Sequence, residues 1–211
     1  VAWMEENHYL RRQDSDAAPR QYEFRFITRS GEIRNILWAV DMISETHQSI
    51  ASCIDITEQK RTANILQSKL YLIEYSMTHS FEDTLSATID EAEKLTDSRI
   101  GFYHVLQEDQ QTLSLQAWST CTSEECTAWP HEQHYKVEET GVWMDCVRWG
   151  EPVIHNDYAS LPHKKGIPQG HPSILRELVV PIFKGETIVA MLGVGNKPGD
   201  YTNADIETLS L

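Results

Sequence analysis

The 211-residue sequence has few basic residues and no long hydrophobic run. Its 18 lysines and arginines are outnumbered by 32 aspartates and glutamates, which gives a formal net charge of −14. This surplus repels phosphate backbones and anionic lipid head groups, so nucleic acid and membrane surfaces are excluded as partners. The longest apolar runs, ELVVPIF and TIVAMLGVG, are far shorter than the roughly 18 residues that a membrane span needs. No secretory signal peptide opens the sequence.

Cysteine is also scarce, with four residues that form neither a CxxC pair nor a zinc-finger spacing: Cys53, Cys121, Cys126 and Cys146. The simplest interpretation is reduced thiols in a cytoplasmic protein. The sequence lacks an initiator methionine and stops within a predicted helix, at DIETLSL. We therefore expect it to be a segment of a longer protein.

The N-terminal part has the pattern of a small antiparallel sheet. Residues 20–29 place Tyr22, Phe24 and Phe26 on one face of a half-buried strand, and the following RSGE turns the chain. Two further β-rich runs follow at residues 33–43 and 48–56. These runs predict a three-stranded meander.

A long helix is predicted after Asp55, with Thr57 available to cap its start. Its apolar residues are spaced 3, 4, 3 and 4, the seam of a coiled coil about two heptads long. Two interpretations stay open, a helix that pairs with a second chain and a stripe that packs on the chain's own domain. The seam consists of Ala63, Leu66, Leu70, Ile73 and Met77.

The remaining residues alternate helical and strand patterns. FEDTLSATIDEAEKLTDS is helical, IGFYHVL and TLSLQAWS are strand candidates, and an irregular polar region follows. A short helix at GVWMDCVRWG, a strand at EPVIH, two apolar strands at LRELVVPIFKG and ETIVAMLGVGN, and a helix from Asn203 complete the order. This order predicts an α+β fold with a central antiparallel sheet flanked by helices.

The first sixty residues resemble the C-terminal part of a PAS domain, the PAC motif. The resemblance is carried by YEFRFITRSGEIRNILWAV and by the closing DITEQKR, after which such domains pass into a signalling helix. The early PAS strands and the helices that wall its ligand cavity are absent from this sequence. This half is therefore not expected to hold a PAS cofactor by itself.

From about Ser80 to Leu211 the sequence resembles a GAF domain. The resemblance is carried by TGVWMDCVRWGEPVIHNDY, ELVVPIFKGETIVAMLGVGNK and NKPGDYTNADIE. In the family the last motif is a structural tie between loop and helix, matched here by Asn196, Lys197, Tyr201 and Asp205, with Ile206 in place of the usual Glu. The predicted organisation is a C-terminal PAS part at 1–57, a signalling helix at 58–79 and a GAF domain at 80–211.

Three histidines spaced eight apart, His155, His163 and His171, stand out in HNDYASLPHKKGIPQGHP. Loop residues eight apart gain no convergence from helical or strand periodicity, so a metal site is not expected. His131 and His134 are spaced for one helical face, but no third ligand is in register. With its prolines and glycines, the segment is interpreted as a lid that crosses a GAF pocket.

Thiol chemistry is the main enzymatic alternative, because some GAF-fold proteins are free methionine sulfoxide reductases that use cysteines. Glu124 and Glu125 lie between Cys121 and Cys126 and would raise the pKa of those thiols, which disfavours a nucleophile. Bilin attachment in other GAF domains is typically signalled by Cys followed by His, whereas Val147 follows Cys146. Neither a covalent bilin nor a metal is expected, and no cofactor is identified.

Aromatic residues crowd the middle of the GAF-like segment: Trp118, Trp129, Tyr135, Trp143, Trp149 and Tyr158. They form either a ligand pocket or an ordinary aromatic core. Under the pocket interpretation, the resemblance predicts a ligand site formed by Trp118, Trp143, Cys146, His155, Tyr158, His163 and His171. We expect a non-enzymatic sensory segment of a bacterial or archaeal signalling protein, a homodimer through its linker helix, read by a downstream histidine kinase or diguanylate cyclase. A purely structural dimerisation module is the remaining alternative.

Overall fold

The computed structural model describes residues 2–14, 16–43, 48–125, 134–136, 141–162, 164 and 173–210. The chain forms two compact units, Val1–Asn64 and Ile65–Leu211. Each unit has its own sheet.

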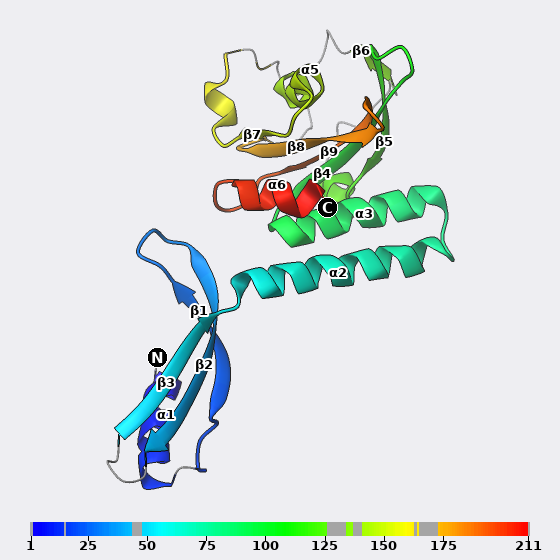
Figure 1. Ribbon diagram of the computed structural model, residues 1–211. Helices are drawn as coiled ribbons and strands as arrows, with labels where there is room; N and C mark the ends of the chain where they lie inside the picture. Colours follow the sequence, from blue (N-terminus) through cyan, green and yellow to red (C-terminus); the bar gives the residue numbers. More distant parts are fainter. Residues whose placement is uncertain are drawn as a thin grey trace. The chain divides into compact units, whose positions relative to one another are not determined.

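The first unit contains one helix and the predicted three-stranded sheet (Figure 1). Strands β1 (Gln21–Ile27), β2 (Ile33–Ile43) and β3 (Gln48–Asp55) pair antiparallel in the order β1-β2-β3. Helix α1 (Ala2–Gln13), which was not expected from the sequence, packs the edge of Trp3 on Tyr22 at 4.9 Å between ring centroids. Gly31 adopts a φ of 89°, a left-handed value that suits glycine in the predicted turn between β1 and β2.

Helix α2 (Thr57–Ser76) starts differently from the prediction. The carboxylate of Asp55, rather than the hydroxyl of Thr57, accepts a hydrogen bond from the first helical N–H, that of Thr57, at 2.9 Å. The Thr57 hydroxyl instead accepts a hydrogen bond from the backbone N–H of Asn35 on β2 at 2.8 Å. The prediction of Thr57 as the cap was wrong because a contact with a strand 22 residues away uses that hydroxyl.

Within the second unit, the two faces of α2 have different environments. Ile65 and Ser68 are buried, and the Ser68 hydroxyl donates a hydrogen bond to Glu91. Four residues of the predicted seam are more than half exposed: Leu66, Leu70, Ile73 and Met77. The interpretation that this stripe packs on the chain's own domain is therefore wrong, because other residues of α2 make that contact.

The second unit is built on a six-stranded antiparallel sheet with the order β6-β5-β4-β9-β8-β7. Most of β9 and the first half of β8 are buried on both faces, which explains their nearly continuous apolar sequence. The strands are β4 (Ile100–Leu106), β5 (Thr112–Trp118), β6 (His134–Lys136), β7 (Val153–His155), β8 (Glu177–Lys184) and β9 (Thr187–Gly195).

Helices cover both faces of this sheet (Figure 1). Helices α3 (Phe81–Thr96) and α6 (Asn203–Ser210) lie on one face, and α5 (Asp145–Trp149) lies on the other. The α3 face has a core that includes Ile89, Leu178 and Leu192. The opposite face, called the α5 face below, has a second core that includes Met144, Cys146, Val179 and Met191. The predicted central antiparallel sheet flanked by helices is confirmed.

The polar region before α5 contains more structure than predicted. Helix α4 (Thr120–Glu125) and strand β6 lie in the stretch that was expected to be irregular. Asp90 of α3 holds the start of α4, because its carboxylate accepts hydrogen bonds from the backbone N–H and the hydroxyl of Thr120 at 2.7 and 2.8 Å. Asp90 and Thr120 are 30 residues apart in the sequence, so local periodicity could not predict this contact.

Candidate functional site

The α5 face contains a buried cluster of three titratable side chains, Asp145, His155 and Glu177. His155 ends β7 and Glu177 starts β8, where the two residues are partners in the antiparallel register. The distance from His155 Nδ1 to Glu177 Oε1 is 2.8 Å, and that from His155 Nε2 to Asp145 Oδ2 is 3.7 Å. The exposed fractions are 2% for Asp145, 8% for His155 and 1% for Glu177. One imidazole therefore lies between two buried carboxylates.

The second carboxylate oxygen of Glu177 has an unusual environment. Oε2 is buried and has no hydrogen-bond partner among the residues that the structure describes. Burial raises the pKa of Glu177, while the hydrogen bond from His155 acts in the opposite direction. A buried acceptor without a donor is costly, so this oxygen is a place where a bound N–H or O–H group would be stabilised.

Burial and the nearby Glu177 also raise the pKa values of Cys146 and Tyr158. Burial first, and the Glu177 charge second, raise the pKa of the Cys146 thiol to about 12 and that of the Tyr158 hydroxyl to about 12. Arg148 partly balances the cluster through a 2.8 Å contact between its Nη1 and Asp145 Oδ1. At neutral pH the thiol and the phenol are therefore uncharged.

An aromatic wall lies on the α5 face. Trp143 stacks on His104 with 5.0 Å between ring centroids, and Phe102 meets Trp143 edge-on at 5.9 Å. Phe102 faces Gly193 of β9, where a Cβ would overlap its ring, so this glycine allows the phenylalanine to lie flat on the sheet. Trp118 is the partner of Phe102 across β4 and β5 and shares its face.

Burial lowers the pKa of His104 to about 4, and a hydrogen bond with the Ser114 backbone opposes this effect. Its imidazole is therefore neutral at physiological pH, which suits a buried side chain that stacks on Trp143 and meets Phe102 edge-on.

The structure brings several predicted site residues to one face of the sheet. Trp118, Trp143, Cys146 and His155 lie on the α5 face, and Tyr158 is buried near Glu177. Trp149 was expected among the aromatic residues of the pocket or core, but it is 59% exposed and belongs to neither. Its side chain projects from the C-terminal end of a short helix whose buried residues are Asp145 and Cys146.

Other predicted residues lie elsewhere or outside the described residues. Cys121 is on α4, not on an irregular segment. The following predicted positions fall outside the described residues, or have side chains that do: Cys126, Trp129, His131, His134, Tyr135, His163 and His171. Residues 163 and 165–172 of the predicted lid also lie outside the described residues.

Sequence reasoning missed Asp145, Glu177 and His104. His104 occupies the inward position between Phe102 and Leu106, and an ionisable residue in that register is a detectable signal. Glu177 directly precedes the apolar run LVVPIF, which is a weaker signal. Asp145 has no local signal, because its proximity to His155 depends on the path of the chain between α5 and β7.

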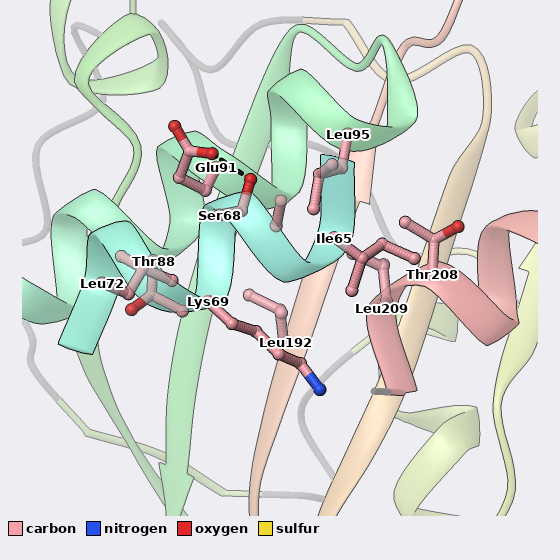
Figure 2. A pocket seen from close by; sticks show the side chains of 11 residues that line it. Ile65, Ser68, Lys69, Leu72, Thr88, Glu91, Leu95, Leu192, Thr208 and Leu209 are labelled. Atoms are coloured by element: carbon pink, nitrogen blue, oxygen red, sulfur yellow. Dashed lines mark hydrogen bonds between the residues drawn. The ribbon is translucent and has the colours of Figure 1, made fainter. Parts of the chain in front are cut away.

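Two hollows lie on or near the helices of the second unit. Figure 2 shows a pocket of about 120 Å³ between α2, α3, α6 and β9, with mainly apolar walls and a hydrogen bond from Ser68 to Glu91. A second hollow of about 270 Å³ is lined by Tyr71, Tyr75 and several acidic residues, of which Asp90 anchors α4. Among the described residues that line them, neither hollow has a buried polar atom without a partner like that of Glu177.

Among the described residues, no group of three or more His, Cys, Asp or Glu side chains is arranged to hold a metal ion. The described part of the chain also contains no helix that is long and apolar enough to span a membrane.

Comparison with known proteins identifies the fold family. The family profile described as "GAF domain" matches residues 78–211, more than half of the chain. The chain belongs to the GAF domain family. Residues 78–211 are called the GAF domain from here on.

One relative is the methyl sulfide methyltransferase-associated sensor of Methanosarcina acetivorans, which is 34% identical over 165 residues. The match covers 74% of this chain but only 16% of that protein. The chain therefore corresponds to a small part of that sensor's length.

Solved structures share the fold at low sequence identity. The GAF domain of a phosphoenolpyruvate-protein phosphotransferase from Coxiella burnetii has a TM-score of 0.57 and 13% identity, covering 69% of this chain and 86% of that one. Its Acinetobacter counterpart has a TM-score of 0.57 and 16% identity, with coverages of 72% and 86%. A free methionine-R-sulfoxide reductase from Neisseria meningitidis has a TM-score of 0.53 and 12% identity, with coverages of 71% and 81%.

The C-terminal motif of the GAF domain acts as a structural tie. Lys197 Nζ lies 2.6 Å from Asp205 Oδ1, and the other carboxylate oxygen of Asp205 accepts hydrogen bonds at the start of α6. Asn196, at a φ of 60°, donates to the Ser173 carbonyl and accepts from the Leu175 N–H, each at 2.8 Å. These contacts hold the chain before β8 against the loop before α6, and they agree with the structural role expected from the sequence.

Proposed function

We propose that this chain is a non-enzymatic sensory segment of a longer signalling protein. In this proposal, the GAF domain binds a small molecule on its α5 face, and α2 transmits the effect along the chain. Trp118, Trp143, Cys146, His155 and Tyr158 belong to the proposed site, together with the newly found Asp145, His104 and Glu177. His163 and His171 remain proposed ligand contacts from the lid.

The observation that carries the proposal is the buried Glu177 oxygen. Ligand sites are mostly apolar with a few convergent polar groups, and the α5 face combines the stacked Trp143 and His104 rings with this acceptor. A ligand with an N–H or O–H group could donate to Glu177 while its apolar part contacts the aromatic wall. The chemistry favours a small amine, amide or alcohol over a carboxylate.

The relative from Methanosarcina acetivorans supports a sensory role, since that protein is named as a sensor. A downstream histidine kinase or diguanylate cyclase, a PAS origin for the first unit, and a cytoplasmic location belong to the proposal as expectations from the resemblance. Direct sequencing beyond Leu211 in the source protein would test the output domain.

Thiol catalysis is disfavoured by the environment of Cys146. A nucleophilic cysteine needs a lowered pKa, whereas burial raises the pKa of this thiol to about 12. The likeness to the Neisseria reductase is at the level of the fold. We expect no turnover of free methionine sulfoxide, and turnover that is lost in Cys146→Ser would contradict the non-enzymatic proposal.

Ligand binding can be tested by thermal shift with a panel of small amines, amides, alcohols and carboxylates. We expect donor compounds that bind to raise the melting temperature of the wild type and to bind at least about tenfold more weakly to Glu177→Gln, because the amide offers one acceptor oxygen where the carboxyl group offers two. Glu186→Gln is the matched control, because it makes the same change at an exposed turn next to β9. Equal binding by both variants would rule out Glu177 as the ligand acceptor.

A further inference from the structure

The pocket between α2, α3, α6 and β9 lies on the α3 face of the sheet, opposite the ligand site proposed above (Figure 2). Its volume is about 120 Å³. Apolar cavities of about 150 Å³ bind benzene, so this pocket has the size for an aromatic ring or a short alkyl chain. Its apolar walls come from the three helices and the strand: Ile65, Leu72, Ala92, Leu95, Leu192 and Leu209.

The pocket exists because α2 and α3 carry small side chains where the two helices meet. Ser68 of α2 and Thr88 and Ala92 of α3 all line it. Protein interiors normally leave few voids larger than a water molecule, and larger side chains at these positions would fill the space. A bound apolar group would therefore supply contacts that the lining side chains lack on one side.

The hydroxyl groups of the lining already donate hydrogen bonds within the chain. Ser68 donates to Glu91, whose carboxylate also accepts from Lys94 Nζ at 2.8 and 3.1 Å. Thr88 and Thr208 each donate to the carbonyl oxygen four residues earlier in their own helix, at 2.8 Å. Because these hydroxyl hydrogens are used, the walls favour a ligand with an apolar body.

The ammonium group of Lys69 gives the pocket a positive charge at its edge. Lys69 is exposed and lines the pocket, and in Figure 2 its nitrogen lies past Leu192, away from the Ser68–Glu91 hydrogen bond. No carboxylate of the described residues forms an ion pair with it. Glu91 is held by Ser68 and Lys94 instead. An anionic head group would therefore be stabilised at Lys69.

We propose that this pocket binds a small monocarboxylate, with its aromatic or short alkyl body between the helices and its carboxylate at Lys69. This ligand class differs from the donor compounds proposed for the α5 face, and the inference does not depend on that site. The ligand contacts α2, α3 and α6 together, so its binding stabilises the packed position of α2.

Methyl NMR of the full 211-residue chain, with benzoate as the probe, tests the location of this site. Ile65 lines the pocket, whereas Ile188 packs against the core of the α5 face, so their methyl signals separate the two faces. We expect millimolar benzoate to move the Ile65 signal and to leave the Ile188 signal unchanged. An Ile65 signal that does not move, or shifts confined to Ile188, would overturn the proposal.

Variants of Lys69 test the charge of the ligand. We expect Lys69→Met to bind benzoate about threefold to fivefold more weakly at low salt, the effect of one exposed ion pair, and Lys69→Arg to bind it like the wild type. Toluene, which has the same ring without the charge, should bind Lys69→Met and the wild type equally. Lys184→Met removes the same charge at the exposed end of β8 and is the matched control. Unchanged benzoate affinity in Lys69→Met, or an equal loss in Lys184→Met, would overturn the assignment of a carboxylate.

Thr88→Leu tests the pocket itself, because the larger side chain fills it from α3. The Thr88 hydroxyl bonds only within its own helix, so its loss breaks no contact between elements. We expect the variant to keep the far-ultraviolet circular dichroism of the wild type and to lose binding of both benzoate and toluene. A folded variant that binds benzoate like the wild type would place the ligand elsewhere and overturn the proposal. The Ile65 and Lys69 measurements do not depend on this substitution.

Discussion

At the scale of single residues, His104 couples the stability of the protein to pH. Burial lowers its pKa in the fold to about 4, below the ordinary histidine value of 6.5. Between these values the unfolded chain takes up a proton that the folded chain does not, so the stability present above pH 6.5 is lost as the pH falls toward 4. The full effect is roughly 3 kcal/mol, because one pKa unit corresponds to about 1.4 kcal/mol.

Denaturant unfolding of the wild type and His104→Gln between about pH 4 and pH 7.5 measures this coupling. We expect the free energy of unfolding to fall less steeply with acid in the variant, whatever its absolute stability. Parallel pH curves for the two proteins would show that His104 is not the group responsible.

The Cys146 thiol should not be alkylated in the folded protein. A pKa of about 12 instead of 9 reduces the thiolate fraction at pH 8 by about a thousandfold, and the side chain is fully buried. Brief iodoacetamide treatment should therefore modify the exposed Cys53 and leave Cys146 unmodified, as read by peptide mass spectrometry. Rapid labelling of Cys146 in the native state would mean that the α5 face opens readily.

At the scale of elements, the start of α3 depends on a reciprocal cap. The Ser80 hydroxyl accepts a hydrogen bond from the Asp83 N–H at 3.1 Å, while the Asp83 carboxylate accepts one from the Ser80 N–H. Ser80→Ala should lower the free energy of unfolding by about 1 kcal/mol in urea titration. Ser86→Ala, inside the same helix, should have little effect, and an equal loss in both variants would contradict the role of the cap.

The exposed apolar residues of α2, Leu66, Leu70, Ile73 and Met77, test the homodimer that the sequence predicts. Replacing both Leu66 and Ile73 with Glu would place four like charges across a paired seam, which costs several kcal/mol in a dimer. The double variant should sediment as a monomer and keep the far-ultraviolet circular dichroism of the folded chain, because both positions are exposed in a single copy. Loss of the GAF fold would show that these residues pack internally.

Periodicity predicted the elements that carry strong patterns and missed those that depend on distant contacts. Apart from β6, the strands of both sheets, α3 and α6 follow from alternation, apolar runs or helical spacing in their own residues. The short helix α4 is held by Asp90 from another helix, and β6 (His134–Lys136) is a three-residue segment without the apolar residues that marked the equally short β7 at EPVIH. The same limit applies to the site, because the contact between His155 and Glu177 joins residues 22 apart.

At the scale of the whole second unit, the two faces of one sheet carry different groups. Alternate residues of β8 point to opposite faces, so Glu177 and Val179 belong to the α5 face while Leu178 and Val180 join the core under α3. The α3 face also carries the inner side of α2, through Ile65, Ser68 and Leu72 at the pocket with α3. A ligand that binds Glu177 would therefore contact β8. The opposite face of β8 packs in the core under α3.

The central claim, that the α5 face binds a small molecule, is tested most directly by NMR of the tryptophan indoles. The sequence has six tryptophans, of which Trp118 and Trp143 lie on the α5 face, and Trp3 and Trp38 belong to the first unit. Titration with a donor compound from the thermal-shift panel should move the Trp143 and Trp118 indole signals, leave Trp3 and Trp38 unchanged, and lose its effect in Glu177→Gln. Shifts confined to Trp3 and Trp38, or shifts of Trp143 that persist equally in Glu177→Gln, would contradict the proposed site.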